Sequence, residues 1–226
     1  MFEQSEEIFM SEEMSINLAD LNTTLDKPEL NHYKNIIVQA VQFFIKQIQA
    51  QQNTNWKPTP FSCNDSPAEL AINQYYFDHF DSIDNLLVSE ISDSLRHAFC
   101  SFAYGGLHQL FTRQENEMWY PEIILSRELK PNDISSLPDV VILYRGTDRS
   151  EFDTKNFGQS WTTKLEVAKD FAFRHYDSQP WFDASNRIVL QTTYLKSDVY
   201  FSNQSCEYEV VVNTSKLQTV QCVKFT

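Results

Sequence analysis

Two acidic residues separated by one position are the sharpest chemical signal in the chain. Glu207 and Glu209 stand directly before the apolar run 210–212, which is typical of a buried strand. In an extended chain, residues two apart project to one side, about 6–7 Å from each other. A fixed carboxylate stabilises the positive charge that develops as a glycosidic bond breaks, and a second can take a proton from the attacking group. The plainer interpretation is a solvated strand edge.

An arginine and a pair of hydroxyls precede these acids. Arg145 ends the apolar run 140–144 and is followed by Gly146, so a guanidinium that can hold a phosphate lies beside a backbone that a ligand can approach closely. Ser160 and Thr162 share a face of an extended segment and could orient a carboxylate or a ribose. Taken singly, these residues also fit an arginine paired with an acid and ordinary strand hydroxyls.

The elements that must position these residues are helices first and strands later, which predicts an α+β fold. Apolar residues recur every four positions after Pro28, and Ser66-Pro67 is typical of a helix start; a helical pattern then runs to Gly105-Gly106. A short helix is expected at 165–174 with Val167, Ala168 and Phe171 facing inward. Strands are expected at 140–144, 187–195, 208–213 and 219–225.

Three regions are expected along the chain. Residues 1–25 are acidic and weakly periodic, which predicts a mobile leader. Residues 26–137 form a helical region, and residues 138–226 form the β core that carries the motifs.

Composition narrows the possible functions. A formal net charge of −13 disfavours general nucleic-acid binding, but it leaves room for a local nucleotide pocket and for a basic protein partner. The histidines and the four cysteines have no metal-ligand spacing, so we expect no metal site and reduced thiols. The cysteines are Cys63, Cys100, Cys206 and Cys222.

The chain has neither a secretory signal pattern nor an apolar run of the roughly 20 residues that a membrane span needs. We therefore expect a soluble protein that is cytoplasmic, or that reaches a target cell by a secretion route independent of a signal peptide.

The order of the motifs resembles the mono-ADP-ribosyltransferase family of the Arg-Ser-Glu class. The resemblance covers about residues 138–226. It rests on Leu-Tyr-Arg-Gly at 143–146, Ser-Trp-Thr at 160–162, Ala-x-x-Phe-Ala at 168–172 and Glu-Tyr-Glu at 207–209 before an apolar strand. It implies a two-sheet ADP-ribosyltransferase-like β core with a nucleotide cleft. The chain departs from the family at Trp161, where a threonine is commoner, and in its short segment between Arg145 and Ser160.

The resemblance also implies a mechanism, with NAD as co-substrate and no metal. Arg145 would lie on the phosphate and ribose side of NAD, and the Gly146 backbone would meet the nicotinamide amide. Ser160 would hold Glu209. Glu209 would bond the nicotinamide-ribose hydroxyl and stabilise the oxocarbenium-like state while nicotinamide leaves. Thr162 and Phe171 complete the residues expected to bind NAD.

Glu207 would orient or deprotonate the acceptor, which the resemblance implies is an arginine of a target protein. A guanidinium needs a nearby carboxylate to become nucleophilic, which gives this expectation physical sense. A nucleic-acid acceptor stays open. The alternatives are a NAD glycohydrolase, in which water is the acceptor, and a non-catalytic module that binds a basic partner. A toxin, an injected effector and a phage-encoded modifier, of bacterial or phage origin, fit the sequence equally.

Overall fold

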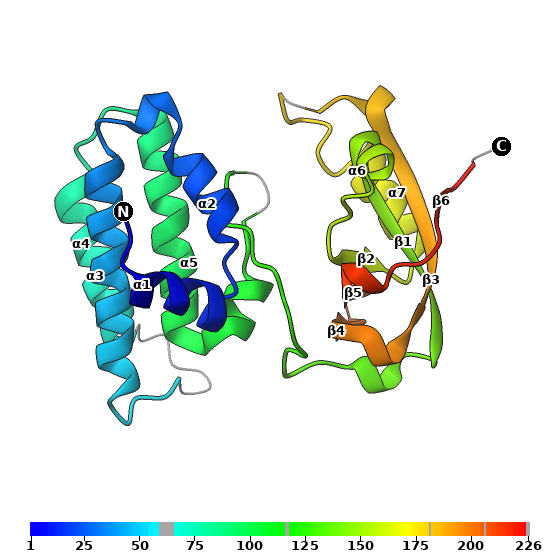
Figure 1. The fold of residues 1–226 in the computed structure, drawn as a ribbon, viewed down its shortest axis with the longest axis horizontal. Helices are drawn as coiled ribbons and strands as arrows, with labels where there is room; N and C mark the ends of the chain where they lie inside the picture. The colour runs from blue at the N-terminus through cyan, green and yellow to red at the C-terminus, as the bar shows by residue number, and fades with distance from the viewer. Residues whose placement is uncertain (59–65, 116–117, 181, 206, 225–226) are drawn as a thin grey trace. The chain divides into compact units, whose positions relative to one another are not determined.

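The computed structural model describes residues 1–58, 66–115, 118–180, 182–205 and 207–224. The chain forms two compact units, Met1–Ile124 and Leu125–Thr226. The first is helical and the second is built on a sheet, so the expected α+β class is confirmed (Figure 1). Each unit is described by itself below.

The helical unit is formed by helices of very different lengths. Its longer helices bury one apolar stripe each, and the predicted repeat of α3 is buried at Ile37, Val41, Phe44 and Ile48. Ser66 caps α4 as expected, because its hydroxyl accepts from the Glu69 amide while the Glu69 carboxylate accepts from the Ser66 amide. The α-helices are α1 (Gln4–Ile8), α2 (Leu18–Leu25), α3 (Lys34–Gln52), α4 (Pro67–Phe80) and α5 (Leu86–Thr112), which kinks at Gly105 and Gly106.

Residues 1–25 differ from the mobile leader that the sequence predicts. They form α1, a π-helical turn (Phe9–Glu13) and α2, and they bury Phe9, Met10 and Met14. The apolar periodicity is weak because these helices are short and interrupted, whereas the glutamates that dominate the composition are exposed or half-buried. Acidic composition alone therefore misjudged a segment that contributes to the core.

The division between the units lies after Ile124 rather than after residue 137. Ser15–Asn17 and Glu122–Ile124 exchange backbone hydrogen bonds, which ties the end of the helical unit to its beginning. The Gln159 side chain holds the Leu125 backbone with two hydrogen bonds of 2.8 Å, and Leu129 donates to Tyr200. Residues 125–137 therefore belong with the sheet.

The sheet unit has one six-stranded antiparallel sheet in the order β4-β5-β2-β1-β3-β6. The expected strand at 187–195 is confirmed to the residue. The strands are β1 (Val140–Asp148), β2 (Ser160–Thr162), β3 (Arg187–Leu195), β4 (Val199–Asn203), β5 (Glu209–Val212) and β6 (Val220–Cys222). The helices are α6 (Arg149–Thr154) and α7 (Leu165–Phe173).

This single sheet differs from the two-sheet core that the resemblance implies. A single residue pair, Tyr144 with Thr162, joins β1 to β2. The sheet therefore consists of two three-stranded halves, β4-β5-β2 and β1-β3-β6, that meet at one point of pairing. Without this pair of residues, the two halves would be counted as two separate sheets.

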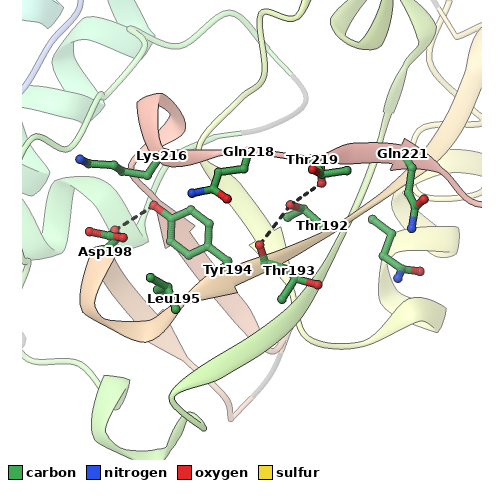
Figure 2. A pocket seen from close by; sticks show the side chains of 10 residues that line it. Thr192, Thr193, Tyr194, Leu195, Asp198, Lys216, Gln218, Thr219 and Gln221 are labelled. Atoms are coloured by element: carbon green, nitrogen blue, oxygen red, sulfur yellow. Dashed lines mark hydrogen bonds between the residues drawn. The ribbon is translucent and has the colours of Figure 1, made fainter.

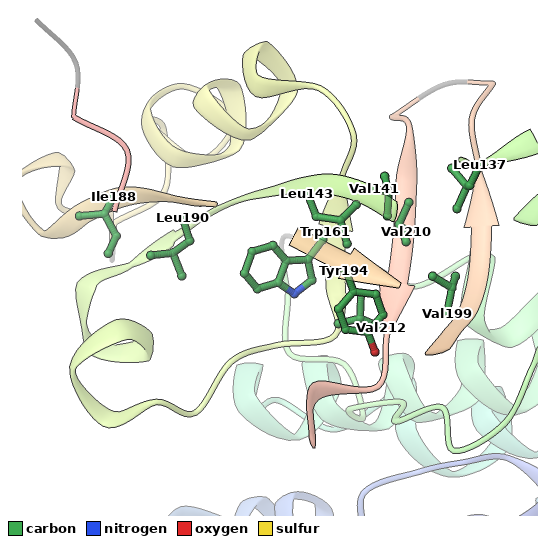
Figure 3. Close-up of a cluster of buried hydrophobic side chains, with 10 residues drawn as sticks. All are labelled: Leu137, Val141, Leu143, Trp161, Ile188, Leu190, Tyr194, Val199, Val210 and Val212. Carbon is green, nitrogen blue, oxygen red and sulfur yellow. The ribbon is translucent and has the colours of Figure 1, made fainter. Parts of the chain in front are cut away.

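The two faces of the sheet are covered differently. One face carries the main apolar cluster, in which Trp161 packs among the inward residues of β1, β3 and β5 (Figure 3). The opposite face is covered in part by α7, whose Ala168 and Ala172 pack on Val189. Alternation along each strand decides which residues reach which face.

Cys100 and Cys222 are present as thiols, while the expectation for Cys63 and Cys206 falls outside the described residues. The helices of the described residues include none with the length and apolar character required to cross a membrane.

Candidate active site

Arg145 lies near the end of β1 and is paired with an acid. Its Nε and Nη2 donate to the two carboxylate oxygens of Glu151, at 2.9 and 2.8 Å. Its Nη1 donates to the Ser160 carbonyl at 2.7 Å. Arg145 is therefore paired with an acid, as the plainer interpretation of the sequence predicts. The same side chain also contacts the Ser-Trp-Thr motif through Ser160.

Glu151, on α6, is a residue that sequence reasoning missed. It also accepts hydrogen bonds from the Thr147 hydroxyl and from the Gly158 amide. Burial acts to raise the pKa of Glu151, but the hydrogen bonds and charge of Arg145, with those of Thr147 and Gly158, outweigh it and lower the pKa. The pattern Asp148-x-x-Glu151 signals a helix start, yet nothing in it indicates contact with Arg145.

Ser160 joins Arg145 to Glu209. Its carbonyl accepts from Arg145, and its hydroxyl donates to Glu209 Oε1 at 2.8 Å. The hydrogen bond from Ser160 to Glu209 that the resemblance implies is therefore present. Burial raises the pKa of Glu209; the Ser160 hydrogen bond acts to lower it, and nearby Glu207 acts to raise it further.

Glu207 and Glu209 do not belong to one extended strand, which the predicted alternation requires. β5 begins only at Glu209, and Tyr208 before it has a left-handed φ of 54°. That conformation breaks the two-residue repeat. Glu207 is consequently exposed, whereas Glu209 is partly enclosed beside Ser160.

The backbone of this loop is held from β2. The Thr162 hydroxyl donates to the Glu207 carbonyl at 2.8 Å, and the Thr163 amide donates to the Tyr208 carbonyl at 3.1 Å. The Lys164 ammonium lies 4.8 Å from the centre of the Tyr208 ring. Thr162, predicted to bind NAD, thus uses its hydroxyl to fix the loop between the two acids.

Gly146 lies against α7, and Phe171 does not take the inward position that the sequence predicts for it. A Cβ at Gly146 would be 2.0 Å from the Ala168 carbonyl oxygen, so this glycine lets α7 pack on β1. Phe171 is half-buried on α7, and the centre of its ring lies 4.6 Å from the centre of the His175 ring. It is not part of the buried cluster of Ala168, Ala172 and Val189. Ala172 occupies the inward position of α7 instead.

Strand register puts the two ends of this network on opposite faces of the sheet. Arg145 pairs with Leu190 and shares the face of the Trp161 cluster. Thr162 pairs with Glu209, on the other face. Ser160, the first residue of β2, links them because its carbonyl serves one side and its hydroxyl the other.

Two hollows in the sheet unit are lined by other residues. One of about 420 Å³ lies along β3 and β6, with Tyr194, Lys216, Gln218 and Gln221 in its wall (Figure 2). A second of about 510 Å³ is lined by residues that include Val140, Ile142 and Tyr208. Neither is lined by Arg145, Ser160, Glu207 or Glu209.

Among the described residues, no three His, Cys, Asp or Glu side chains form a group that could hold a metal ion. The chain matches no family model, and no curated protein or solved structure is significantly similar to it.

Proposed function

We propose that the protein is a mono-ADP-ribosyltransferase that uses NAD and acts on an acceptor, namely an arginine of a target protein. The observation that carries the proposal is the continuous chain of hydrogen bonds from Arg145 through Ser160 to Glu209. Three motifs separated by 14 and 48 residues, counted from Arg145 to Ser160 and from Ser160 to Glu209, become one polar network. The residue types match those a glycosidic bond cleavage requires.

The reaction breaks the bond between the ribose C1′ and the nicotinamide nitrogen, and nicotinamide leaves with the electron pair. Glu209, ionised, faces the ribose and stabilises the oxocarbenium-like state. Ser160 donates to Glu209 and fixes its orientation. The acceptor nitrogen then attacks C1′ and loses a proton to Glu207, whose exposure suits contact with an incoming partner.

Arg145 supplies the phosphate contact, and NAD is long enough to use both ends of the network. The dinucleotide would pass the Ser160 end of β2, with its phosphates toward Arg145 and its nicotinamide ribose toward Glu209. The point where the two halves of the sheet meet, at Tyr144 and Thr162, lies beside this path. The proposal therefore includes a cleft along this path that is large enough to hold NAD.

Replacement of Glu209 tests the proposal. The protein is incubated with NAD labelled in its adenine ring and a cell lysate, and both nicotinamide release and protein labelling are measured. Glu209→Gln should lower both by about 100- to 1,000-fold, because it removes the charge that stabilises the transition state. An unaltered protein that releases no nicotinamide would refute the proposal.

Glu207→Gln separates transfer from hydrolysis. It should retain nicotinamide release while protein labelling falls, because water needs less activation by Glu207 than a guanidinium does. Equal loss of both products would contradict the role given to Glu207. Nicotinamide release without labelled protein in the unaltered chain would instead favour the glycohydrolase.

A further inference from the structure

We propose that Glu151 is a positioning residue, which fixes the guanidinium of Arg145 so that two of its N–H groups face a phosphate of NAD. This inference rests on the proposed function and deepens it. It assigns a role to a residue that the motif resemblance does not include.

The Glu151 carboxylate receives four hydrogen bonds. Two come from Arg145, at 2.9 and 2.8 Å, one from the Gly158 amide at 3.1 Å and one from the Thr147 hydroxyl. The side chains of Arg145 and Glu151 are only 21% and 23% exposed, so solvent screens this pair less than it screens a surface pair. A carboxylate held by strand, helix and loop together has one orientation.

That orientation determines what Arg145 can still bind. A guanidinium carries five N–H groups. Glu151 takes two and the Ser160 carbonyl takes a third, which leaves two without a partner among the described residues, one on Nη1 and one on Nη2. A planar group held along one edge presents its remaining donors in a fixed direction, as bidentate phosphate binding requires.

The backbone at Gly158 confines the guanidinium from another side. A Cβ at Gly158 would stand 2.3 Å from Arg145 Nη2 and 2.8 Å from Cζ. Only a residue without a side chain leaves room for the guanidinium there. The Gly158 amide also donates to Glu151, so one short segment contacts both partners of the ion pair.

A purely structural ion pair is the competing account. If Glu151 only stabilised the fold, its loss would reduce the amount of folded enzyme and so the apparent kcat, without changing the affinity for NAD. A positioning role predicts the reverse. Removal of a contact present equally in the ground state and the transition state raises KM and leaves kcat nearly unchanged.

The test compares Glu151→Gln with Glu166→Gln. Glu166 is a matched control because it is also paired with a cation, Lys169 at 2.8 Å, but its side chain is 77% exposed on α7. With nicotinamide release from NAD as the readout, Glu151→Gln should raise KM about 10-fold or more with kcat within about threefold. Glu166→Gln should leave both constants within about twofold.

Two further measurements separate Glu151 from Arg145 and from turnover. In an Arg145→Gln background, adding Glu151→Gln should change KM little, because a residue that acts through Arg145 has no effect once Arg145 is gone. Equilibrium binding of NAD, measured by calorimetry in a Glu209→Gln background, should weaken by the same factor as KM. Additive effects on KM in the double variant would overturn the positioning role.

The outcomes also distinguish this inference from the proposed function. If the unaltered protein releases no nicotinamide, the proposed function fails and takes the inference with it. If turnover is present but KM and NAD affinity do not respond to Glu151→Gln, the inference alone fails. Should that variant not fold, Glu151→Asp carries the test, because it keeps the charge but draws the carboxylate back from Arg145 and should raise KM in the same direction.

Discussion

The two units of the molecule divide its charge very unequally. Residues 1–124 hold 18 Asp and Glu against 6 Lys and Arg, a formal charge of −12, whereas residues 125–226 hold 13 against 12, a charge of −1. The predicted site lies wholly in the nearly neutral unit. The chain-wide charge of −13 therefore describes the helical unit, and it says little about which anions the sheet unit can bind.

One polar side chain in each unit illustrates two different roles, Gln51 in the helical unit and Glu209 in the sheet unit. In the helical unit, the Gln51 amide donates to the Ala103 carbonyl and accepts from the Ala68 amide, so it joins three helices and serves packing. In the sheet unit, burial raises the pKa of Glu209, which marks an ionised carboxylate there as unfavourable. Gln51 therefore serves packing, whereas the cost of ionising Glu209 is one that the proposed mechanism has to meet.

The largest expected effects come from the two cores. Trp161→Ala and Phe99→Ala each remove a fully buried aromatic side chain and should each cost about 3–5 kcal/mol of stability. Trp161 stands between Ser160 and Thr162, so its loss should also abolish NAD turnover. Phe99→Ala should leave turnover intact below its melting temperature. Thermal unfolding with a nicotinamide-release assay checks both, and equal loss of turnover would mean that the units are not functionally separate.

The next largest effect distinguishes two glycines. Gly146→Ala places a methyl group 2.0 Å from the Ala168 carbonyl oxygen of α7. This overpacking should lower the free energy of unfolding by about 3 kcal/mol and abolish turnover. Gly106 has open space around it but a φ of 66° and ψ of −158°, so Gly106→Ala should cost about 1–3 kcal/mol through strain alone. Denaturant unfolding and turnover should be measured for both variants. Impaired turnover in Gly106→Ala would contradict the comparison.

Smaller effects are expected at two helix starts. Ser66→Ala and Asp148→Ala each remove an N-cap, at about 1 kcal/mol. Because α6 carries Glu151, Asp148→Ala should also raise KM for NAD, while Ser66→Ala should not change it. Calorimetric melting and steady-state kinetics test the pair. A KM unchanged in Asp148→Ala would show that Glu151 does not depend on its helix cap.

The smallest expected effect is a displacement of the pH profile. The proposed mechanism requires Glu209 to be ionised, and burial raises the pKa of Glu209. Nicotinamide release should therefore fall on the acid side at a higher pH than an ordinary glutamate would give. The charge of Glu207 adds to this rise; Glu207→Gln should therefore lower the pKa of Glu209 and move the acid limb to lower pH. The measurement is kcat/KM against pH, with Glu166→Gln as control. An acid limb that stays in place would mean that Glu207 does not influence Glu209.

Local signals made parts of the fold predictable. The Ser66 cap was predictable because capping depends on residues within one helical turn. The strand at 187–195 was predictable from its own run of apolar residues. The helices at 1–25 were missed because their apolar residues become meaningful only against the rest of the core. The strand β4 was missed for the same kind of reason, since its pairing with β5 identifies it.

The candidate site shows the same limit. Residue types and motif order predicted that Arg145, Ser160 and Glu209 belong together, and the structure brings them into one network. Glu151 was not predictable, because six residues that cross from a strand into a helix give no fixed distance between side chains. The strand repeat is broken between Glu207 and Glu209 by one left-handed residue, Tyr208, whose type does not favour that conformation.

The double use of Ser160 has a consequence for how the site can change over generations. Arg145 is anchored to the main-chain carbonyl of Ser160, which every amino acid supplies, whereas Glu209 is anchored to its hydroxyl, which only a few side chains could replace. Substitution of Ser160 would therefore remove the hydrogen bond to Glu209 and leave the one from Arg145 in place. Under the proposed function, a descendant that had lost the Ser160 side chain would keep the contact that anchors Arg145 and lose the one that orients Glu209, so nucleotide binding would outlast catalysis.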